Sequence, residues 1–393
     1  MEISTLCVHG SGKKYDITGA VSVPIFASST FAHPAVGQST GFDYSRSQNP
    51  TKEHLEQAVT ALEGGTDTIA FSSGMAAVSA LMELFSPGDH IVASYDLYGG
   101  TFRLFTHISK KNGIKFSYAA KTGEIRAKIT PNTKAVFIET PTNPMMNVID
   151  IAAAAEITQK EKLLLIVDNT FLTPVFQRPL SLGANIVLHS GTKYLGGHND
   201  ALAGMLTVND SAAPCGYVLS ERLRFIAKTT GGCLSPFDSF LIIRGIKTLA
   251  VRMERHNKTA LAVAKWLSSQ MKIRKVYYIG LDDHPDYEIS CRQADGFGGM
   301  ISFSVDDEQT AKSILENVRL IKYAESLGGT ESLITYPLLQ THADLPQEER
   351  EARGINACLL RLSVGLEDAQ DIIADLKQAF LNTESGQTIE GVK

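Results

Sequence analysis

Short apolar segments alternate with amphipathic segments through the first two thirds of the chain. Leu55, Val59 and Leu62 recur at helical spacing in a segment that Pro50 opens and Gly64 ends, which predicts a helix. Further helices are predicted over residues 76–85 and 152–159 and after residue 101. Fully apolar runs predict strands at residues 68–71, 90–93, 135–138, 163–167 and 185–188. Strands that are apolar on both faces are typical of a parallel sheet covered on both sides, so we expect an α/β domain with a mostly parallel central sheet flanked by helices.

The pattern changes near residue 245. A long amphipathic helix, two strands and two shorter helices predict a smaller α+β unit; they cover residues 249–270, 300–305, 309–317, 359–364 and 368–380. Residues 1–50 are rich in Gly, Ser and Thr with little periodicity, which indicates an extended arm that contacts a partner subunit. We therefore expect an arm over 1–50, a large domain over 51–247 and a small C-terminal domain over 248–393, in which 384–393 form a mobile tail.

Composition excludes several classes of protein. The chain has 393 residues, of which 44% are hydrophobic and 20% charged, as expected for a globular protein of two or three domains. A net charge of -5 without a long basic run argues against nucleic-acid and membrane surfaces. Five scattered cysteines without a C-x-x-C pair indicate neither a metal site nor a disulfide framework. Because no signal pattern or membrane-length apolar run is present, we expect a cytoplasmic protein.

Five polar side chains follow predicted strands of the large domain: Ser73, Tyr98, Asn143, Asp168 and Lys193. Ligands of parallel α/β sheets bind at the carboxyl ends of the strands, where these side chains are expected to converge. This edge of the sheet is therefore the candidate active site.

Lys193 lies in the run His189-Ser190-Gly191-Thr192-Lys193-Tyr194. A lysine amine can form a Schiff base with the aldehyde of pyridoxal phosphate. An acid such as Asp168 can pair with the pyridine nitrogen and keep it protonated, so that the ring accepts electrons. By itself the run is also compatible with a solvated lysine, because short motifs of this kind occur by chance.

The remaining cofactor groups are weighed in the same way. Gly74 and Met75 open a predicted helix whose free N–H groups favour a phosphate, although an ordinary helix cap gives the same pattern. Ser190 and Thr192 can donate hydrogen bonds to that phosphate. The ring of Tyr98 can stack on the pyridine or can pack in the core.

Arg361 lies inside the apolar strand Leu360-Arg361-Leu362-Ser363-Val364. A buried guanidinium needs a partner, and its fork suits the α-carboxylate of an amino acid. An intramolecular salt bridge is the alternative. In the arm, Tyr44 and Arg46 are separated by one residue and point the same way on an extended strand, which suggests an active site shared across a dimer interface.

Several longer motifs lie in order along the chain: Asp43-Tyr44-Ser45-Arg46 with Asn49-Pro50-Thr51, Ser73-Gly74-Met75-Ala76-Ala77, Tyr98-Gly99-Gly100-Thr101, Glu139-Thr140-Pro141-Thr142-Asn143-Pro144, Val167-Asp168-Asn169-Thr170, Thr192-Lys193-Tyr194 and Arg361-Leu362-Ser363-Val364-Gly365. Together, over about residues 5 to 380, they resemble a known family, the trans-sulfuration enzymes of Cys/Met metabolism. These are pyridoxal-phosphate enzymes of the aspartate-aminotransferase-like fold, also called fold type I.

The resemblance implies a role for each residue. Lys193 would bind the cofactor aldehyde and then move protons between substrate carbons, and Tyr98 would stack on the ring and accept a proton. Asp168 would pair with the pyridine nitrogen, and Asn143 would lie near the cofactor hydroxyl. Phosphate binding would fall to Gly74, Met75, Ser190 and Thr192, with Tyr44 and Arg46 from the partner subunit. Arg361, assisted by Ser326, would hold the substrate carboxylate in a homotetramer of two such dimers.

The specific reaction depends on a few further residues. Asp43 and Glu325 resemble the acidic pair of cystathionine γ-synthases and suit the distal amino group of cystathionine or cysteine, although solvated surface acids would look the same. Gly100 stands where methionine γ-lyases usually carry Cys. The residues favour γ-replacement on an O-acyl-L-homoserine by L-cysteine, as in methionine biosynthesis. Cystathionine β- or γ-lyase is the alternative, followed by methionine γ-lyase and by a pyridoxal-phosphate-binding regulator without activity.

Overall fold

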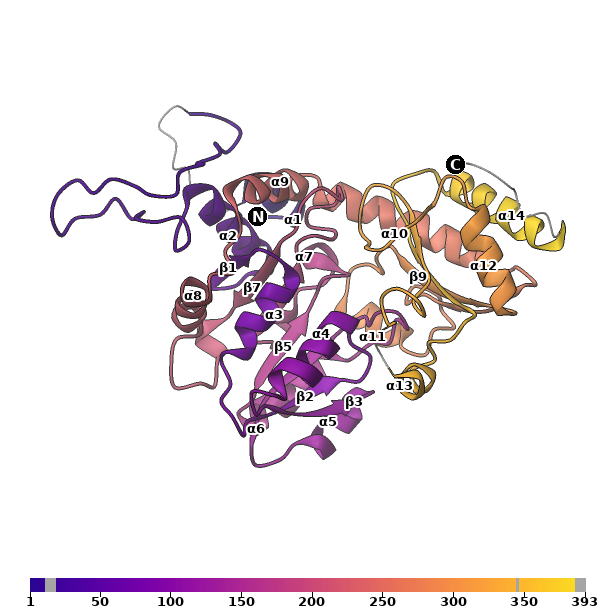
Figure 1. Cartoon of the computed structure of the whole chain (residues 1–393), viewed down its shortest axis with the longest axis horizontal. Helices are drawn as coiled ribbons and strands as arrows, with labels where there is room; N and C mark the ends of the chain where they lie inside the picture. Colours follow the sequence, from indigo (N-terminus) through magenta and orange to yellow (C-terminus); the bar gives the residue numbers. More distant parts are fainter. Residues whose placement is uncertain (11–18, 344–345, 386–393) are drawn as a thin grey trace.

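The computed structural model describes residues 1–10, 19–343 and 346–385. They form two sheets with helices packed around them, and the chain passes from the larger sheet to the smaller one through a long helix, α10 (Figure 1). The strands of the larger sheet are β1 (Asp67–Phe71), β2 (His90–Ser94), β3 (Lys115–Ala119), β4 (Thr133–Glu139), β5 (Leu164–Asp168), β6 (Ile186–Ser190) and β7 (Gly204–Val208). Those of the smaller sheet are β8 (Ile273–Tyr277), β9 (Met300–Val305), β10 (Lys322–Tyr323), β11 (Leu333–Thr335) and β12 (Leu359–Ser363).

The helices surround both sheets. Those up to the end of the larger sheet are α1 (Ile3–His9), α2 (Pro50–Glu63), α3 (Gly74–Met82), α4 (Gly99–Arg103), the π-helix η1 (Leu104–Ser109), α5 (Thr122–Lys128), α6 (Ile151–Glu161), α7 (Thr173–Phe176) and the 3-10 helix η2 (Pro179–Leu182). The later ones are the 3-10 helix η3 (Asp210–Ala212), α8 (Leu219–Thr230), α9 (Pro236–Ile246), α10 (Leu249–Ser268), α11 (Tyr287–Gln293), α12 (Glu308–Asn317), α13 (Gln347–Ala352) and α14 (Ala369–Ser385).

The larger sheet is mostly parallel, as predicted. Its order is β1-β7-β6-β5-β4-β2-β3. Strands β2 to β6 run parallel to one another, whereas β7 is antiparallel to both β6 and β1. The connection from β6 to β7 contains no crossover helix, which a parallel pairing would require. Strand β3 was missed in the sequence because it is a half-exposed edge strand rather than a fully apolar one.

Successive residues of β5 serve opposite faces of the sheet. Leu164 and Ile166 belong to the core under α3 and α8, and Leu165 and Val167 belong to the core under α6. Both faces are therefore dry, which explains why the strand is apolar throughout. The same covering on both faces leaves the carboxyl ends of the strands as the place where polar groups gather.

The smaller sheet is covered by helices on one face. Leu360 and Leu362 of β12 pack with residues of α10, α12 and α14. Because side chains alternate along a strand, Arg361 points to the other face, toward the larger sheet. Its neighbour across β9, Ser302, donates a hydrogen bond to the carbonyl of Pro144 in the large domain at 2.6 Å. The two sheets are thus joined on the side where Arg361 lies.

The N-terminal region differs in part from the expected extended arm. Residues 3–9 form α1, which packs on α2 and α10 and buries Cys7, because Ile3, Leu6 and Cys7 share one helical face. Much of the segment 19–49 extends away from the body of the molecule (Figure 1), and within it Thr30 and Tyr44 form an isolated antiparallel β-bridge. Most of the predicted mobile tail, residues 386–393, lies outside the described residues. None of the described helices is long and apolar enough to cross a bilayer.

Candidate active site

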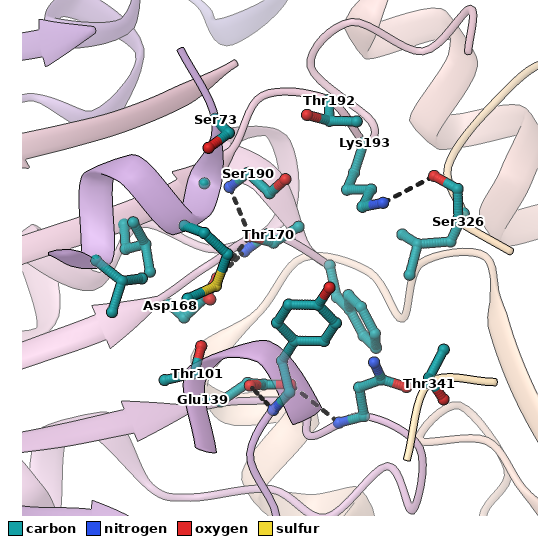
Figure 2. A pocket seen from close by; sticks show the side chains of 18 of the residues that line it. Ser73, Thr101, Glu139, Asp168, Thr170, Ser190, Thr192, Lys193, Ser326 and Thr341 are labelled. Carbon is teal, nitrogen blue, oxygen red and sulfur yellow. Dashed lines mark hydrogen bonds between the residues drawn. The ribbon is translucent and has the colours of Figure 1, made fainter. Parts of the chain in front are cut away.

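A cavity of about 370 Å³ opens at the carboxyl edge of the larger sheet. The five polar residues that the sequence placed after strands all line it: Ser73, Tyr98, Asn143, Asp168 and Lys193. The opposite side is closed by Ser326, Thr341 and Arg361, which come from the part of the chain that holds the smaller sheet; Figure 2 labels Ser326 and Thr341. Topology therefore brings together residues that are up to 288 positions apart, from Ser73 to Arg361.

Asp168 ends β5 and carries its carboxylate into the cavity. Its Oδ1 accepts hydrogen bonds from the N–H of Thr170 at 3.0 Å and from the Thr170 hydroxyl at 2.5 Å (Figure 2). Burial raises the pKa of Asp168, while the hydrogen bonds of Thr170 and the nearby His189 act to lower it. Among the described residues nothing is hydrogen-bonded to Oδ2, so this oxygen is available to a protonated ring nitrogen.

Thr170 is a residue that the sequence analysis missed. Its hydroxyl donates to Asp168 and accepts the N–H of Ser190 at 2.9 Å, which ties β5 to the end of β6. On the opposite side of the sheet from the cavity, His189 contacts Glu63 at 2.5 Å, and Asn169 donates to the same Glu63 oxygen at 3.2 Å. A small hydroxyl residue two positions after the acid was the available signal.

The first turn of α3 forms a cup for an anion. Ser73 caps the helix by accepting the N–H of Ala76 at 3.0 Å, which leaves the N–H groups of Gly74 and Met75 without intrahelical partners. A Cβ atom on Gly74 would lie 3.1 Å from Cβ of Ser190, so the glycine permits this close approach. Ser190 and Thr192 complete the cup on the cavity wall.

Lys193 lies in the turn that follows β6, and its side chain is directed at the small domain. Its amine donates a hydrogen bond to the hydroxyl of Ser326 at 2.7 Å (Figure 2). Burial and repulsion from Arg361 lower the pKa of Lys193 to about 8, against a smaller opposing effect of Glu325. An amine with this pKa is partly neutral near physiological pH, as a nucleophile toward an aldehyde must be.

Arg361 is buried, with 1% of its surface exposed, yet it has no acidic partner among the described residues. Its guanidinium donates to neutral oxygens only: Asn143 Oδ1 at 2.9 Å, the Ser326 carbonyl at 2.9 Å and the Thr335 hydroxyl at 3.1 Å. The alternative of an intramolecular salt bridge is therefore wrong. A buried cation with neutral neighbours on the wall of a cavity is suited to an anionic ligand.

Asn143 lines the cavity, as expected of a residue near the cofactor, and its side-chain oxygen accepts a hydrogen bond from Arg361, so it also orients the guanidinium. Ser326, with a positive φ of 85°, is also more than an assistant of Arg361 because it contacts Lys193 and Arg361 at once.

Tyr98 is 40% exposed and lines the cavity, so packing in the core is not its role. Gly100 lies directly behind its ring: a Cβ atom at position 100 would lie 2.5 Å from Tyr98 Cε1 and 3.1 Å from Met75 Sδ. Any residue larger than glycine at position 100 therefore forces the ring or its neighbours to move. This includes the cysteine that methionine γ-lyases are expected to carry.

The arm residues do not reach the cavity of their own chain. Asp43 accepts a hydrogen bond from Ser39 at 2.6 Å, and the guanidinium of Arg46 lies over the Tyr44 ring at 5.5 Å. Glu325, by contrast, is exposed at the rim, where it borders both the cavity and a neighbouring open space of about 910 Å³. The expected pair of Asp43 and Glu325 is therefore not formed within one chain.

Two further wall residues were given no role in the sequence analysis. Glu139 ends β4 and accepts the N–H of Tyr98 at 2.8 Å and of Asn143 at 3.1 Å (Figure 2). Thr341 comes from the small domain, and its carbonyl lies so close to Gly99 that a Cβ there would approach it to 2.3 Å. Thr341 has no signal in the sequence, whereas Glu139 is a charged end to an apolar strand.

These groups fit pyridoxal phosphate. The N–H and hydroxyl groups at the first turn of α3 face one end of the cavity. Oδ2 of Asp168, which accepts no hydrogen bond from a described residue, faces another part. The amine of Lys193, with its lowered pKa, lies between these groups and the smaller sheet. The buried guanidinium adds a site for the carboxylate of an amino acid. No group of His, Cys, Asp or Glu suited to a metal ion occurs among the residues that the structure describes.

Comparisons with known proteins agree with this geometry. A family described as "Cys/Met metabolism PLP-dependent enzyme" matches residues 4–381. The chain is 49% identical over 383 residues to a cystathionine gamma-synthase of Haemophilus influenzae, covering 97% of this chain and 98% of the relative. It is 47% identical over 384 residues to a cystathionine gamma-lyase of Bacillus subtilis, covering 97% of this chain and all of the relative.

A third relative and a solved structure widen the range of activities. A cystathionine beta-lyase of Lactococcus lactis is 46% identical over 380 residues, with 96% of this chain and 98% of the relative covered. The crystal structure of a cystathionine gamma-lyase from Lactobacillus plantarum, complexed with L-serine, superposes with a TM-score of 0.94 at 42% identity, covering 98% of this chain and all of that one. Relatives of nearly equal identity thus catalyse different reactions.

Proposed function

The chain belongs to the Cys/Met metabolism pyridoxal-phosphate-dependent enzymes, of fold type I, and from this premise we propose γ-replacement on an O-acyl-L-homoserine by L-cysteine as its reaction. The observation that carries this choice is Glu325, an exposed acid between the cavity and an adjoining space of about 910 Å³. A replacement reaction needs room and a charge partner for a second amino acid, and this rim offers both. The γ-synthase relative supports the same choice.

The cofactor, when bound, supplies an electron sink for the pair left at Cα of the substrate. Asp168 would hold the ring nitrogen in its protonated form, the first turn of α3 with Ser190 and Thr192 would hold the phosphate, and Tyr98 would pack against the ring. Asn143 and Ser326 orient the guanidinium of Arg361, which binds the α-carboxylate and so fixes which bond at Cα faces Lys193.

Lys193 is the proton carrier in this assignment. Its amine takes the proton from Cα and then serves Cβ, because loss of a group from Cγ requires a second deprotonation there. The hydrogen bond to Ser326 at 2.7 Å places the amine between the two domains. A pKa lowered to about 8 by burial and by Arg361 matches an amine that both accepts and returns protons near neutral pH.

The proposed assembly is a homotetramer of dimers in which the arm completes the site of the partner. Support comes from the segment 19–49, much of which extends away from the body of its own chain (Figure 1), and from Asp43, Tyr44 and Arg46, which do not line the cavity of their own chain. In the partner, Tyr44 and Arg46 would join the phosphate cup and Asp43 would face Glu325. The cytoplasmic location stays a prediction that fractionation tests.

A product assay tests the proposed reaction. The holoenzyme is incubated with O-acetyl- or O-succinyl-L-homoserine plus L-cysteine and, in parallel, with L-cystathionine alone. Cystathionine formed in the first mixture supports γ-replacement. Homocysteine with pyruvate from the second shows a β-lyase, and cysteine with 2-oxobutyrate shows a γ-lyase; either result as the dominant activity overturns the proposal.

The elimination of cystathionine is the second candidate function. It is favoured by the two lyase relatives of 47% and 46% identity, and the same lysine and arginine serve both chemistries. The regulator without activity is disfavoured because the residues for cofactor binding, carboxylate binding and proton transfer all line one cavity.

A further inference from the structure

Glu139 is a buried acid on the cavity wall, 6% exposed, with no ion-pair partner among the described residues. Burial, and then the neighbouring Asp168 across the parallel pair β4–β5, raise the pKa of Glu139 well above its ordinary value. Burying a carboxyl group in this way costs free energy. Neither cofactor binding nor carboxylate binding, as assigned above, accounts for its presence.

The two oxygens of Glu139 have separate partners. Oε2 accepts the backbone N–H of Tyr98 at 2.8 Å, and Oε1 accepts the backbone N–H of Asn143 at 3.1 Å (Figure 2). Tyr98 belongs to the segment after β2, and Asn143 belongs to the turn after β4. One carboxyl group therefore joins two loops from neighbouring strands.

The two loops serve different halves of the site. Tyr98 presents the ring that covers the cofactor, and Asn143 orients the guanidinium of Arg361 at 2.9 Å. A shift of either backbone would change the distance between the cofactor plane and the carboxylate site. A misplacement of about 1 Å is enough to lower a rate a hundredfold in such arrangements.

We propose that Glu139 is a positioning residue. It fixes the position of the Tyr98 ring relative to the carboxylate site formed by Asn143 and Arg361. Its geometry supports this role, because only a side chain with two acceptor oxygens can accept the backbone N–H groups of Tyr98 and Asn143 at the same time. The inference deepens the proposed function and rests on the assignment of Arg361 as the carboxylate ligand.

Two substitutions separate the geometry from the charge. Glu139→Gln keeps the length but turns one acceptor into a donor that faces a backbone N–H, so only one bridge bond survives. Glu139→Asp keeps the charge but is one methylene too short to span both N–H groups. If bridging is the role, both variants are impaired; if the charge alone matters, Glu139→Asp behaves as wild type.

Glu56→Gln is the control. Glu56 is likewise buried, at 2% exposure, and its Oε1 accepts the backbone N–H of Ala70 at 2.9 Å, but it does not line the cavity and, unlike Glu139, it is paired with Arg224 at 3.2 Å. This control reports what the loss of a buried carboxylate does to the fold in general.

The experiment measures the binding of L-serine and of ethanolamine to each holoenzyme by the change in cofactor absorbance. Ethanolamine is L-serine without its carboxylate. The dissociation constant of ethanolamine divided by that of L-serine therefore reports the contribution of the carboxylate site alone. We expect the ratio to fall by about tenfold in Glu139→Gln and Glu139→Asp, as loss of one oriented charge-assisted contact predicts, and to stay unchanged in Glu56→Gln. Circular dichroism of the bound cofactor should change in the same two variants.

Two outcomes overturn the inference. An unchanged ratio and an unchanged dichroism band in folded Glu139→Gln, or wild-type behaviour of Glu139→Asp, exclude bridging as the role. A wild-type ratio near one contradicts the carboxylate site itself and the inference with it, which distinguishes failure of the proposed site from failure of the role of Glu139.

Discussion

The amine of Lys193 and the hydroxyl of Ser326 lie 2.7 Å apart, although Lys193 follows β6 of the larger sheet and Ser326 lies between β10 and β11 of the smaller sheet. Ser326 also offers its carbonyl to Arg361 at 2.9 Å. Ser326 therefore contacts both Lys193, the proposed proton carrier, and Arg361, the proposed carboxylate ligand. Any movement between the sheets changes the proposed site at the position of Lys193.

Lys193→Ala removes the amine that is assigned to hold the cofactor. The purified variant is expected to lose the visible absorbance band that survives dialysis in the wild type, together with all activity. Lys312→Ala, at an exposed position of α12, is the control and should keep both. A variant at position 193 that retains the dialysis-resistant band would contradict the assignment.

The pH dependence of cofactor loading follows from the charge around Lys193. Burial and Arg361 lower its pKa to about 8, so the nucleophilic neutral amine increases as the pH rises through this value. The rate at which the apoenzyme recovers its absorbance band should rise with pH and level off above about pH 8.

Two variants should shift the midpoint of this pH dependence, which reports the pKa of Lys193, in opposite directions. Arg361→Gln removes a cation that disfavours the charged amine, so the midpoint should rise. Glu325→Gln removes an anion that favours the charged amine, so the midpoint should fall. Shifts of the same sign in both variants would show that the field of these two side chains does not act on Lys193.

Gly100→Ala tests the packing behind the Tyr98 ring. The new methyl group would lie 2.5 Å from Tyr98 Cε1, so the ring must move away from its place on the cavity wall. We expect kcat to fall by about tenfold or more with a changed dichroism band of the cofactor, because the ring no longer covers it in the same position. Gly123→Ala, with no atom within 4 Å of the added Cβ, is the control. Unchanged dichroism in Gly100→Ala would mean that the ring position is not set by this contact.

Asp43→Ala and Glu325→Ala test the proposed site for the distal amino group. Inhibition constants are measured for L-cystathionine and for L-ethionine, a thioether without that amino group. In each variant the inhibition constant of cystathionine should rise by about tenfold and that of ethionine should stay unchanged, because one charged contact is lost. The cofactor band should remain.

Glu331→Ala is the control for that pair, because Glu331 lines the neighbouring open space but is bonded to Asn199 at 2.9 Å. An equal effect of Glu331→Ala would show that the overall negative charge at the rim, rather than a specific contact of Asp43 or Glu325, weakens the binding of cystathionine. Loss of the cofactor band in Asp43→Ala or Glu325→Ala would show that these acids support the cofactor site instead.

The sequence by itself determined the local elements and the chemistry they carry. Apolar runs such as 163–167 specify buried strands because a side chain must be apolar on either face of a covered sheet. The position of Lys193 and Asp168 after such strands was enough to predict where they meet, since parallel strands end at one edge. The resemblance of the motifs to a known family then predicted the cofactor.

Tertiary structure alone decided what surrounds these groups. That Arg361 has only neutral partners, that Glu139 joins Tyr98 to Asn143, and that Gly100 lies behind the Tyr98 ring depend on contacts between segments far apart in the chain. Such contacts have no local signal, because periodicity reports which face of an element is buried but not which residue covers it. The sequence predicts that the arm serves a partner subunit, and the folded chain agrees in that Asp43, Tyr44 and Arg46 do not line the cavity of their own chain.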